Sequence, residues 1–259
     1  MPETFADALA ARSARDPGRP LLTFYDDASG ERVELSVATY ANWVAKTASL
    51  LVEECDLERG QRLVLDLPVH WLGAVFLGAA WTAGLCVVSS PSPERADAHL
   101  SAGTPDAVVT GPVALGRWSP LAAQIPVLAC SLRPLGARFA DPLPPGVRDV
   151  GVEVWGQPDV FLALDPAVGG DEAVPGRTQA ELIREASLGA LVAPGGRLLS
   201  TVDPAHQHGA PVLLEPLVGG GSLVLVAHPD RERLAATCDA ERATALLDDP
   251  RDGDQPSSW

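Results

Sequence analysis

The chain has 259 residues, a formal net charge of −15 and 46% hydrophobic residues. This length allows a buried core in one domain or in two closely packed subdomains. The negative charge argues against binding to nucleic acids and to anionic membrane surfaces.

The sequence has no uncharged apolar run of 18 residues with membrane flanks, and its start lacks the basic and apolar regions of a signal peptide, so we expect a cytoplasmic protein. The four cysteines form no C-x-x-C pair, which favours core thiols in a reducing compartment over a disulfide or metal role. They are Cys55, Cys86, Cys130 and Cys238. Of the 19 basic residues only Lys46 is a lysine, and it lies off the apolar stripe of its predicted helix, so we expect a solvated surface lysine.

The first third of the chain predicts a helix, a hairpin and a second helix. Thr4 caps a helix over residues 3–15, and the turn at 26–30 separates two short strands, 21–25 and 32–35. Residues 37–54 carry the clearest amphipathic pattern, with apolar side chains at helical spacing.

Residues 60–90 predict a strand, a helix and a second strand. The apolar run at 63–67 ends at Pro68, apolar residues at helical spacing follow from Trp71 to Ala80, and Gly84 precedes the strand 85–88. Two parallel strands joined by a helix form a right-handed βαβ unit. We therefore expect a parallel α/β sheet, which the predicted strands at 106–110 and 125–130 extend; a short helix over 92–101 precedes them.

The order of these elements resembles the N-terminal part of the adenylate-forming superfamily, which includes the acyl-CoA synthetases. The resemblance rests on Ser36 with Tyr40 before an alanine-rich helix, on Gly60-Gln61-Arg62-Leu63, and on Trp81-Thr82-Ala83-Gly84-Leu85 before a valine-rich strand. It implies a fold of mostly parallel sheets flanked by helices, in two similar packed subdomains.

The second half continues the alternation of strands and helices. The predicted strands are Val160 to Leu164, Arg197 to Val202 and Ser222 to Val226. Thr178 with Glu181 predicts a capping box at the start of a helix over 178–190, and further helices are predicted before 217 and over 231–247. We assign 1–135 to a first subdomain, 136–158 to a Pro/Gly-rich seam, 159–247 to a second subdomain that is incomplete relative to the family, and 248–259 to a disordered tail.

The resemblance implies a phosphate-binding loop after the strand 160–164. The family loop is rich in Ser, Thr and Gly and ends in a lysine, so that backbone N–H groups, hydroxyls and a cation surround the phosphates. The matching residues 165–172 keep Gly169 and Gly170, but they contain no serine, threonine or lysine and bring three carboxylates. We interpret this loop as a degenerate nucleotide site.

The stretch 204–226 resembles the family segment that contributes a pocket histidine, and His206 falls within one residue of that position. His208 adds a second imidazole, but too few ligands lie nearby in sequence to predict a metal site. The alternative is that His206 is a solvent-facing loop residue.

No sequence pattern predicts a catalytic residue, and the family segments that hold the ribose and the catalytic lysine have no counterpart. We therefore expect a non-catalytic, acyl-CoA synthetase-like module that binds a ligand or another protein. Surface left uncovered by the missing part would be buried in a homodimer or against a protein partner. The alternative is an AMP-forming acyl- or amino-acid-activating enzyme, or a half-enzyme with a separate C-terminal partner, using ATP and Mg²⁺.

Overall fold

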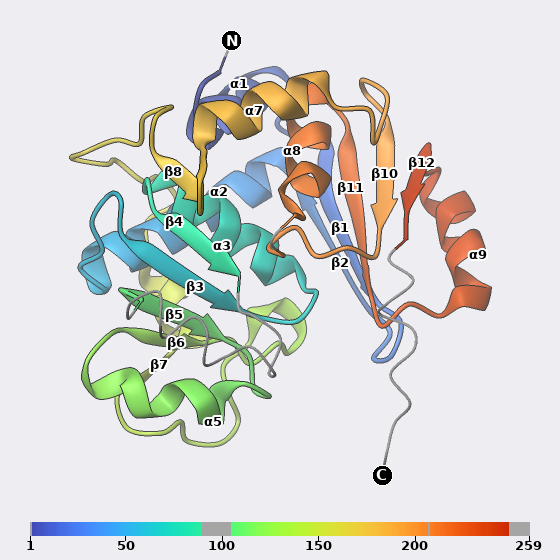
Figure 1. Cartoon of the computed structure of the whole chain (residues 1–259). Coiled ribbons are helices and arrows are strands. Elements are labelled where there is room, and N and C mark those ends of the chain that lie inside the picture. Colours follow the sequence, from blue (N-terminus) through green and yellow to red (C-terminus); the bar gives the residue numbers. More distant parts are fainter. Residues whose placement is uncertain (1, 90–104, 207, 249–259) are drawn as a thin grey trace.

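The computed structural model describes residues 2–89, 105–206 and 208–248. Two five-stranded sheets lie on either side of a central layer of helices (Figure 1). The first sheet has the order β4-β3-β5-β6-β7 and is parallel throughout. The second has the order β12-β10-β11-β1-β2, in which only β2 is antiparallel to its neighbour. The predicted class, α/β with mostly parallel sheets flanked by helices, is confirmed.

The strands of the first sheet are β3 (Arg62–Asp66), β4 (Cys86–Ser89), β5 (Ala107–Thr110), β6 (Val127–Ala129) and β7 (Val147–Asp149). Those of the second are β1 (Pro20–Asp26), β2 (Glu31–Ser36), β10 (Arg197–Ser200), β11 (Ser222–Ala227) and β12 (Ala245–Leu247). A two-residue strand, β9 (Arg177–Thr178), pairs with β8 (Glu172–Val174) outside both sheets.

The main helices are α1 (Phe5–Arg15), α2 (Val37–Ser49), α3 (Trp71–Thr82), α7 (Gln179–Leu188), α8 (Ala210–Gly219) and α9 (Arg231–Glu241). A π-helical turn, η1 (Leu50–Glu54), continues α2. Shorter helices are α5 (Leu115–Trp118), η3 (Ser119–Ala123), η4 (Pro134–Gly136), α6 (Val150–Glu153) and η5 (Val154–Gly156).

Helix α3 occupies the centre of the layer between the sheets. All of its residues from Trp71 to Trp81 are buried, which explains why its sequence is apolar on every side. It packs against α1 and α2, and the side chains of Phe5 and Tyr40 approach Gly78. Smaller apolar clusters lie on the outer faces, under Trp118 of α5 and under Leu234 of α9. The fold is therefore five alternating layers of helix and sheet.

Most predicted elements are confirmed, including the Thr4 cap, the β1–β2 hairpin and the complete capping box of Thr178 and Glu181. Two predictions are wrong. Residues 160–164 form no strand, and Val160, Leu162 and Leu164 are 65%, 82% and 102% exposed. The last predicted helix stops at Glu241, where a left-handed Arg242 (φ 53°) turns the chain into β12.

The sheets do not follow the order of the chain. The hairpin β1–β2 belongs to the first 36 residues, yet β1 pairs with β11, with Leu22 opposite Leu223. The second sheet thus combines the start of the chain with residues 197–247, which the predicted division at 1–135 and 159–247 did not anticipate. The predicted helix over 92–101 and the tail beyond Asp248 lie outside the described residues.

In the described part of the chain, no helix has the length and apolarity needed to cross a membrane.

Candidate functional site

The carboxyl ends of strands from both sheets meet at one edge of the molecule (Figure 1). Ser89 ends β4, and its hydroxyl donates a hydrogen bond of 2.6 Å to the carbonyl oxygen of Ala205, which follows β10. In open parallel sheets, ligands bind outside the carboxyl ends of the strands. We call this edge the strand-end site and define it by His70, Ser89, Asp203 and His206.

His70 lies between β3 and α3, and its surroundings shift its pKa strongly. Its Nδ1 accepts a hydrogen bond from the backbone N–H of Leu72, and its ring packs 4.8 Å from that of Phe24. The side chain is 4% exposed, and this burial lowers the pKa of His70 to about 4. Because Nδ1 is the acceptor, the neutral ring carries its proton on Nε2, which has no hydrogen-bond partner among the described residues. His70 is thus a neutral ring whose Nε2–H donor makes no hydrogen bond to the described residues.

Sequence analysis missed His70. The available signal was a histidine directly after the carboxyl end of a predicted parallel strand, a position that favours ligand contacts. Its burial depends on Phe24 of the other sheet, and the sequence did not predict that contact.

His206 also belongs to the strand-end site, but its side chain is exposed. The turn that carries it is held by Asp203, whose Oδ1 accepts a hydrogen bond of 2.9 Å from the N–H of Ala205. His208 is exposed as well. A pocket role for His206 stays a prediction, and no group of three or more metal-ligating side chains occurs within residues 2–89, 105–206 and 208–248.

Gly169 and Gly170 lie at the opposite end of β4 from His206. Their loop is bound by Arg59, which precedes β3 and whose side chain lies against Gly84 at the amino end of β4. His206, in contrast, follows Ala205 at the carboxyl end. The structure therefore does not bring the predicted nucleotide glycines and the predicted pocket histidine together.

The geometry at Gly169 is explained by packing. A Cβ at this position would lie 3.0 Å from Cβ of Glu3 and 3.2 Å from Cβ of Ala180, so the close approach of the residue before the α1 cap and of α7 accounts for a glycine here. Gly170 faces open space.

The carboxylates of the loop already have partners. Arg59 lies 2.9 Å from Asp165 and 3.6 Å from Asp171. Asp171 also accepts a hydrogen bond from the N–H of Val168, and Glu172 accepts one from Gly176. Two N–H groups in and beside the loop are therefore used internally, and its nearest cation is paired with carboxylates.

Lys46 is not the free surface lysine that we predicted. Its side chain is 19% exposed, its ammonium group lies 2.9 Å from Asp159, and it also donates a hydrogen bond to the carbonyl oxygen of Gln157. These contacts attach α2 to the start of the exposed segment 160–164.

No family model matches the chain. A protein of Mycobacterium tuberculosis described as "TIGR03089 family protein" is 34% identical over 255 residues, which cover 95% of this chain and 99% of that protein.

The fold is similar to that of solved acyl-CoA synthetases. A structure of the Brucella canis acyl-CoA synthetase matches with a TM-score of 0.77 at 16% identity, covering 96% of this chain and 47% of that chain. The acetoacetyl-CoA synthetase from Streptomyces lividans matches with a TM-score of 0.76 at 17% identity, covering 95% and 42%. The chain thus spans about half the length of these structures or less, and it has the architecture of their N-terminal part.

Proposed function

The chain belongs to the TIGR03089 family, and we propose that it is a binding protein that uses the acyl-CoA synthetase fold without the adenylation reaction. The observation that carries the proposal is the loop at 165–172. Its carboxylates Asp165 and Asp171 pair with Arg59, and its sequence supplies no hydroxyl and no lysine.

The electrostatics of this loop oppose a nucleotide. A triphosphate beside three carboxylates is repelled unless metal ions compensate, and Arg59 beside the loop is already paired with Asp165 and Asp171. The one lysine of the sequence, Lys46, is bound to Asp159. The residues that cradle and neutralise phosphates in adenylate-forming enzymes therefore have no equivalent around Gly169 and Gly170.

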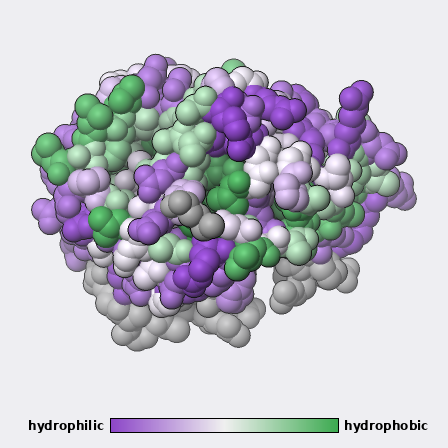
Figure 2. Space-filling model, turned by 90° about the horizontal axis from the view of Figure 1, so that it is seen from above, coloured by the Kyte–Doolittle hydropathy of each residue, from purple (hydrophilic) through white to green (hydrophobic). Residues whose placement is uncertain are grey.

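An exposed apolar surface supports the interaction role. Val160, Leu162 and Leu164 project from the segment before β8, and Val168 nearby is 47% exposed. Figure 2 shows hydrophobic residues gathered on the side of the molecule where Figure 1 places this segment. Exposed apolar patches of this kind are typical of protein interaction sites, and we propose that this surface, the 160–168 surface, is covered by another protein or by a second copy of the chain.

The adenylation part is tested by thermal denaturation and calorimetry with ATP, AMP and acyl-CoAs, with and without Mg²⁺. A ligand at a hundredfold excess over Kd stabilises the folded state by about 2.7 kcal/mol, which is easily measured. We expect no Mg²⁺-dependent stabilisation by ATP at the loop. Mg²⁺-dependent ATP binding that is lost in Asp165→Asn/Asp171→Asn would overturn the proposal and favour an activating enzyme or half-enzyme.

The interaction part is tested by light scattering over a range of concentrations. We expect association of the wild type that Leu162→Ser/Leu164→Ser removes. The control is Leu188→Ser on α7, which changes a side chain that is 81% exposed but lies outside the 160–168 surface. A monomer at every concentration would exclude the second copy and direct the search to other proteins.

A further inference from the structure

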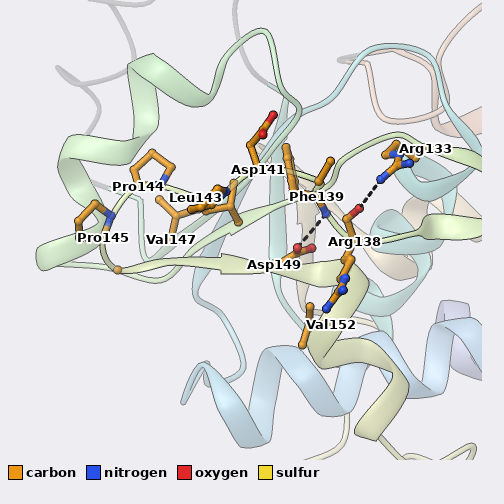
Figure 3. A pocket seen from close by; sticks show the side chains of 13 residues that line it. Arg133, Arg138, Phe139, Asp141, Leu143, Pro144, Pro145, Val147, Asp149 and Val152 are labelled. Atoms are coloured by element: carbon orange, nitrogen blue, oxygen red, sulfur yellow. Dashed lines mark hydrogen bonds between the residues drawn. The ribbon is translucent and has the colours of Figure 1, made fainter.

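A pocket of about 770 Å³ lies between the Pro-rich loop and the β7–α6 segment. Figure 3 shows Arg133 and Arg138 at one end of this pocket and Pro144 and Pro145 at the other. Its volume is in the range of sites that hold small organic ligands. It belongs neither to the strand-end site nor to the loop at 165–172.

The two arginines form no ion pair in the part of the chain that the structure describes. Arg133 donates a hydrogen bond of 3.3 Å to the carbonyl oxygen of Arg138, which involves no carboxylate. Both side chains are exposed, and across the residues that the structure describes neither guanidinium lies within ion-pair distance of an acidic group. Arg59 and Arg197, in contrast, both have carboxylate partners. Arg133 and Arg138 thus place two exposed guanidinium groups beside one pocket.

Asp149, one of the two acids that line the pocket, accepts hydrogen bonds from the backbone. One of its oxygens accepts a hydrogen bond of 2.9 Å from the N–H of Phe139 (Figure 3), and the other accepts one of 2.9 Å from the N–H of Gly151. Asp149 therefore fixes the loop through these two contacts. Asp141 also lines the pocket, with an exposed side chain that would oppose an anion.

The backbone that carries Arg138 is tightly held. Gly151 lies so close that a Cβ there would be 2.6 Å from the backbone nitrogen of Arg138, and Gly146 closes the loop with φ +80°. Together with the two bonds of Asp149, these contacts fix the position from which the Arg138 side chain extends. A fixed attachment lowers the entropy lost when a ligand binds.

We propose that this pocket binds a small organic anion, with a carboxylate or phosphate head on Arg133 and Arg138 and an apolar body on Phe139, Leu143 and Val152. A guanidinium presents a planar fork of N–H donors that matches both head groups in a bidentate geometry. The apolar residues line the same pocket and suit a short hydrocarbon or aromatic body. The site is independent of the proposed function, because it uses neither the loop at 165–172 nor the 160–168 surface.

The test is calorimetric titration of the full chain with octanoate and with phenyl phosphate, and benzyl alcohol serves as the uncharged control. The first two probes distinguish a carboxylate ligand from a phosphate ligand. We expect at least one of them to bind at moderate ionic strength and benzyl alcohol not to bind. Arg138→Gln and Arg133→Gln should each weaken that binding at least tenfold, which corresponds to about 1.4 kcal/mol.

The matched control is Arg233→Gln, which removes the same charge from an exposed position on α9. An equal loss in this control would show that overall charge, not the pocket, attracts the anion, and it would overturn the proposal. Absence of binding by both anions, or unchanged binding in Arg138→Gln with an unchanged melting temperature, would overturn it as well. Because ATP is itself an organic anion, ATP binding that Arg138→Gln removes belongs to this pocket, whereas binding that Asp165→Asn/Asp171→Asn removes belongs to the loop.

Discussion

The ammonium group of Lys46 lies 2.9 Å from the carboxylate of Asp159, and at the other end of the same segment Arg59 lies 2.9 Å from Asp165. These two ion pairs attach both ends of the segment 159–165 to the rest of the molecule, although the segment pairs with no described strand. The apolar side chains of Val160, Leu162 and Leu164 are kept outward by electrostatic contacts at both ends.

We predict that Asp159→Asn/Asp165→Asn releases this segment. Both carboxylates are more than half exposed, so the loss of unfolding free energy should be small, about 1 kcal/mol in total at most. Proteolytic cleavage within residues 159–165 should accelerate at least fivefold, while cleavage within β10 and β11 stays unchanged. Uniform acceleration across the chain would contradict a local role.

The buried His70 predicts a loss of stability in mild acid. Its pKa of about 4 in the folded state lies below the ordinary value of 6.5, so the unfolded chain binds the proton first as the pH falls. The contribution of His70 to stability is therefore complete at pH 7 and declines from about pH 6.5 toward pH 4, by about 2 kcal/mol between pH 7 and pH 5.

This is measured as the difference between wild type and His70→Asn in urea unfolding at pH 7 and pH 5. Asparagine keeps the capping acceptor for the N–H of Leu72 and removes the titration. The decline should be about 2 kcal/mol smaller in His70→Asn, whereas His206→Asn, which changes an exposed histidine, should follow the wild type. If the free energy of unfolding changed equally with pH in all three proteins, the interpretation of His70 as a buried neutral ring would be wrong.

Glu241 joins three elements, because its carboxylate accepts hydrogen bonds from Tyr25, Arg32 and Arg197. Its side chain is 10% exposed and that of Arg197 is 16% exposed, so Glu241→Gln leaves a half-desolvated guanidinium without its anion. We expect a loss of about 2 kcal/mol in the free energy of unfolding. The control Glu34→Gln removes the exposed partner of Arg32 and should cost less than about 0.5 kcal/mol; a similar cost for both would argue against the network.

Gly78 marks the closest packing of the central layer. A Cβ at this position would lie 2.6 Å from the hydroxyl oxygen of Tyr40 and 2.8 Å from Cζ of Phe5, and both side chains are buried. Gly78→Ala should therefore destabilise the protein by about 2 kcal/mol despite the higher helix propensity of alanine. Gly116→Ala in α5 meets no atom within 4 Å and should be neutral or slightly stabilising, so equal effects in the two variants would contradict the packing argument.

Local sequence signals predicted the elements whose causes are local. The capping box of Thr178 and Glu181, the Thr4 cap and the apolar run of β3 each depend on residues within one turn or one strand, and all three are confirmed. The prediction at Val160 to Leu164 was wrong because an apolar run does not reveal whether a neighbouring strand exists to pair with it. The end of α9 at Arg242 was missed because glycine or asparagine usually occupies a left-handed cap.

The candidate site was less predictable than the fold because it depends on distant contacts. The burial of His70 comes from Phe24 of the other sheet. In the loop at 165–172, Asp165 is paired with Arg59, which lies roughly 100 residues earlier in the chain. Neither pairing leaves a pattern in the sequence, whereas the composition of the loop, with its three carboxylates, already argued against a phosphate site.

The pairing of β1 with β11 sets an order for biosynthesis. Leu22 can pair with β11 only after Leu223 has been synthesised, roughly 200 residues later. At 5–20 residues per second, this takes about 10–40 s of translation. During this time Leu21, Leu22 and Phe24, all 0–1% exposed in the finished protein, have no partner strand on that side. The first sheet, whose strands all come from residues 62–149, can assemble before the chain is complete. Until β11 has been synthesised, the nascent hairpin thus exposes apolar side chains that the folded protein buries.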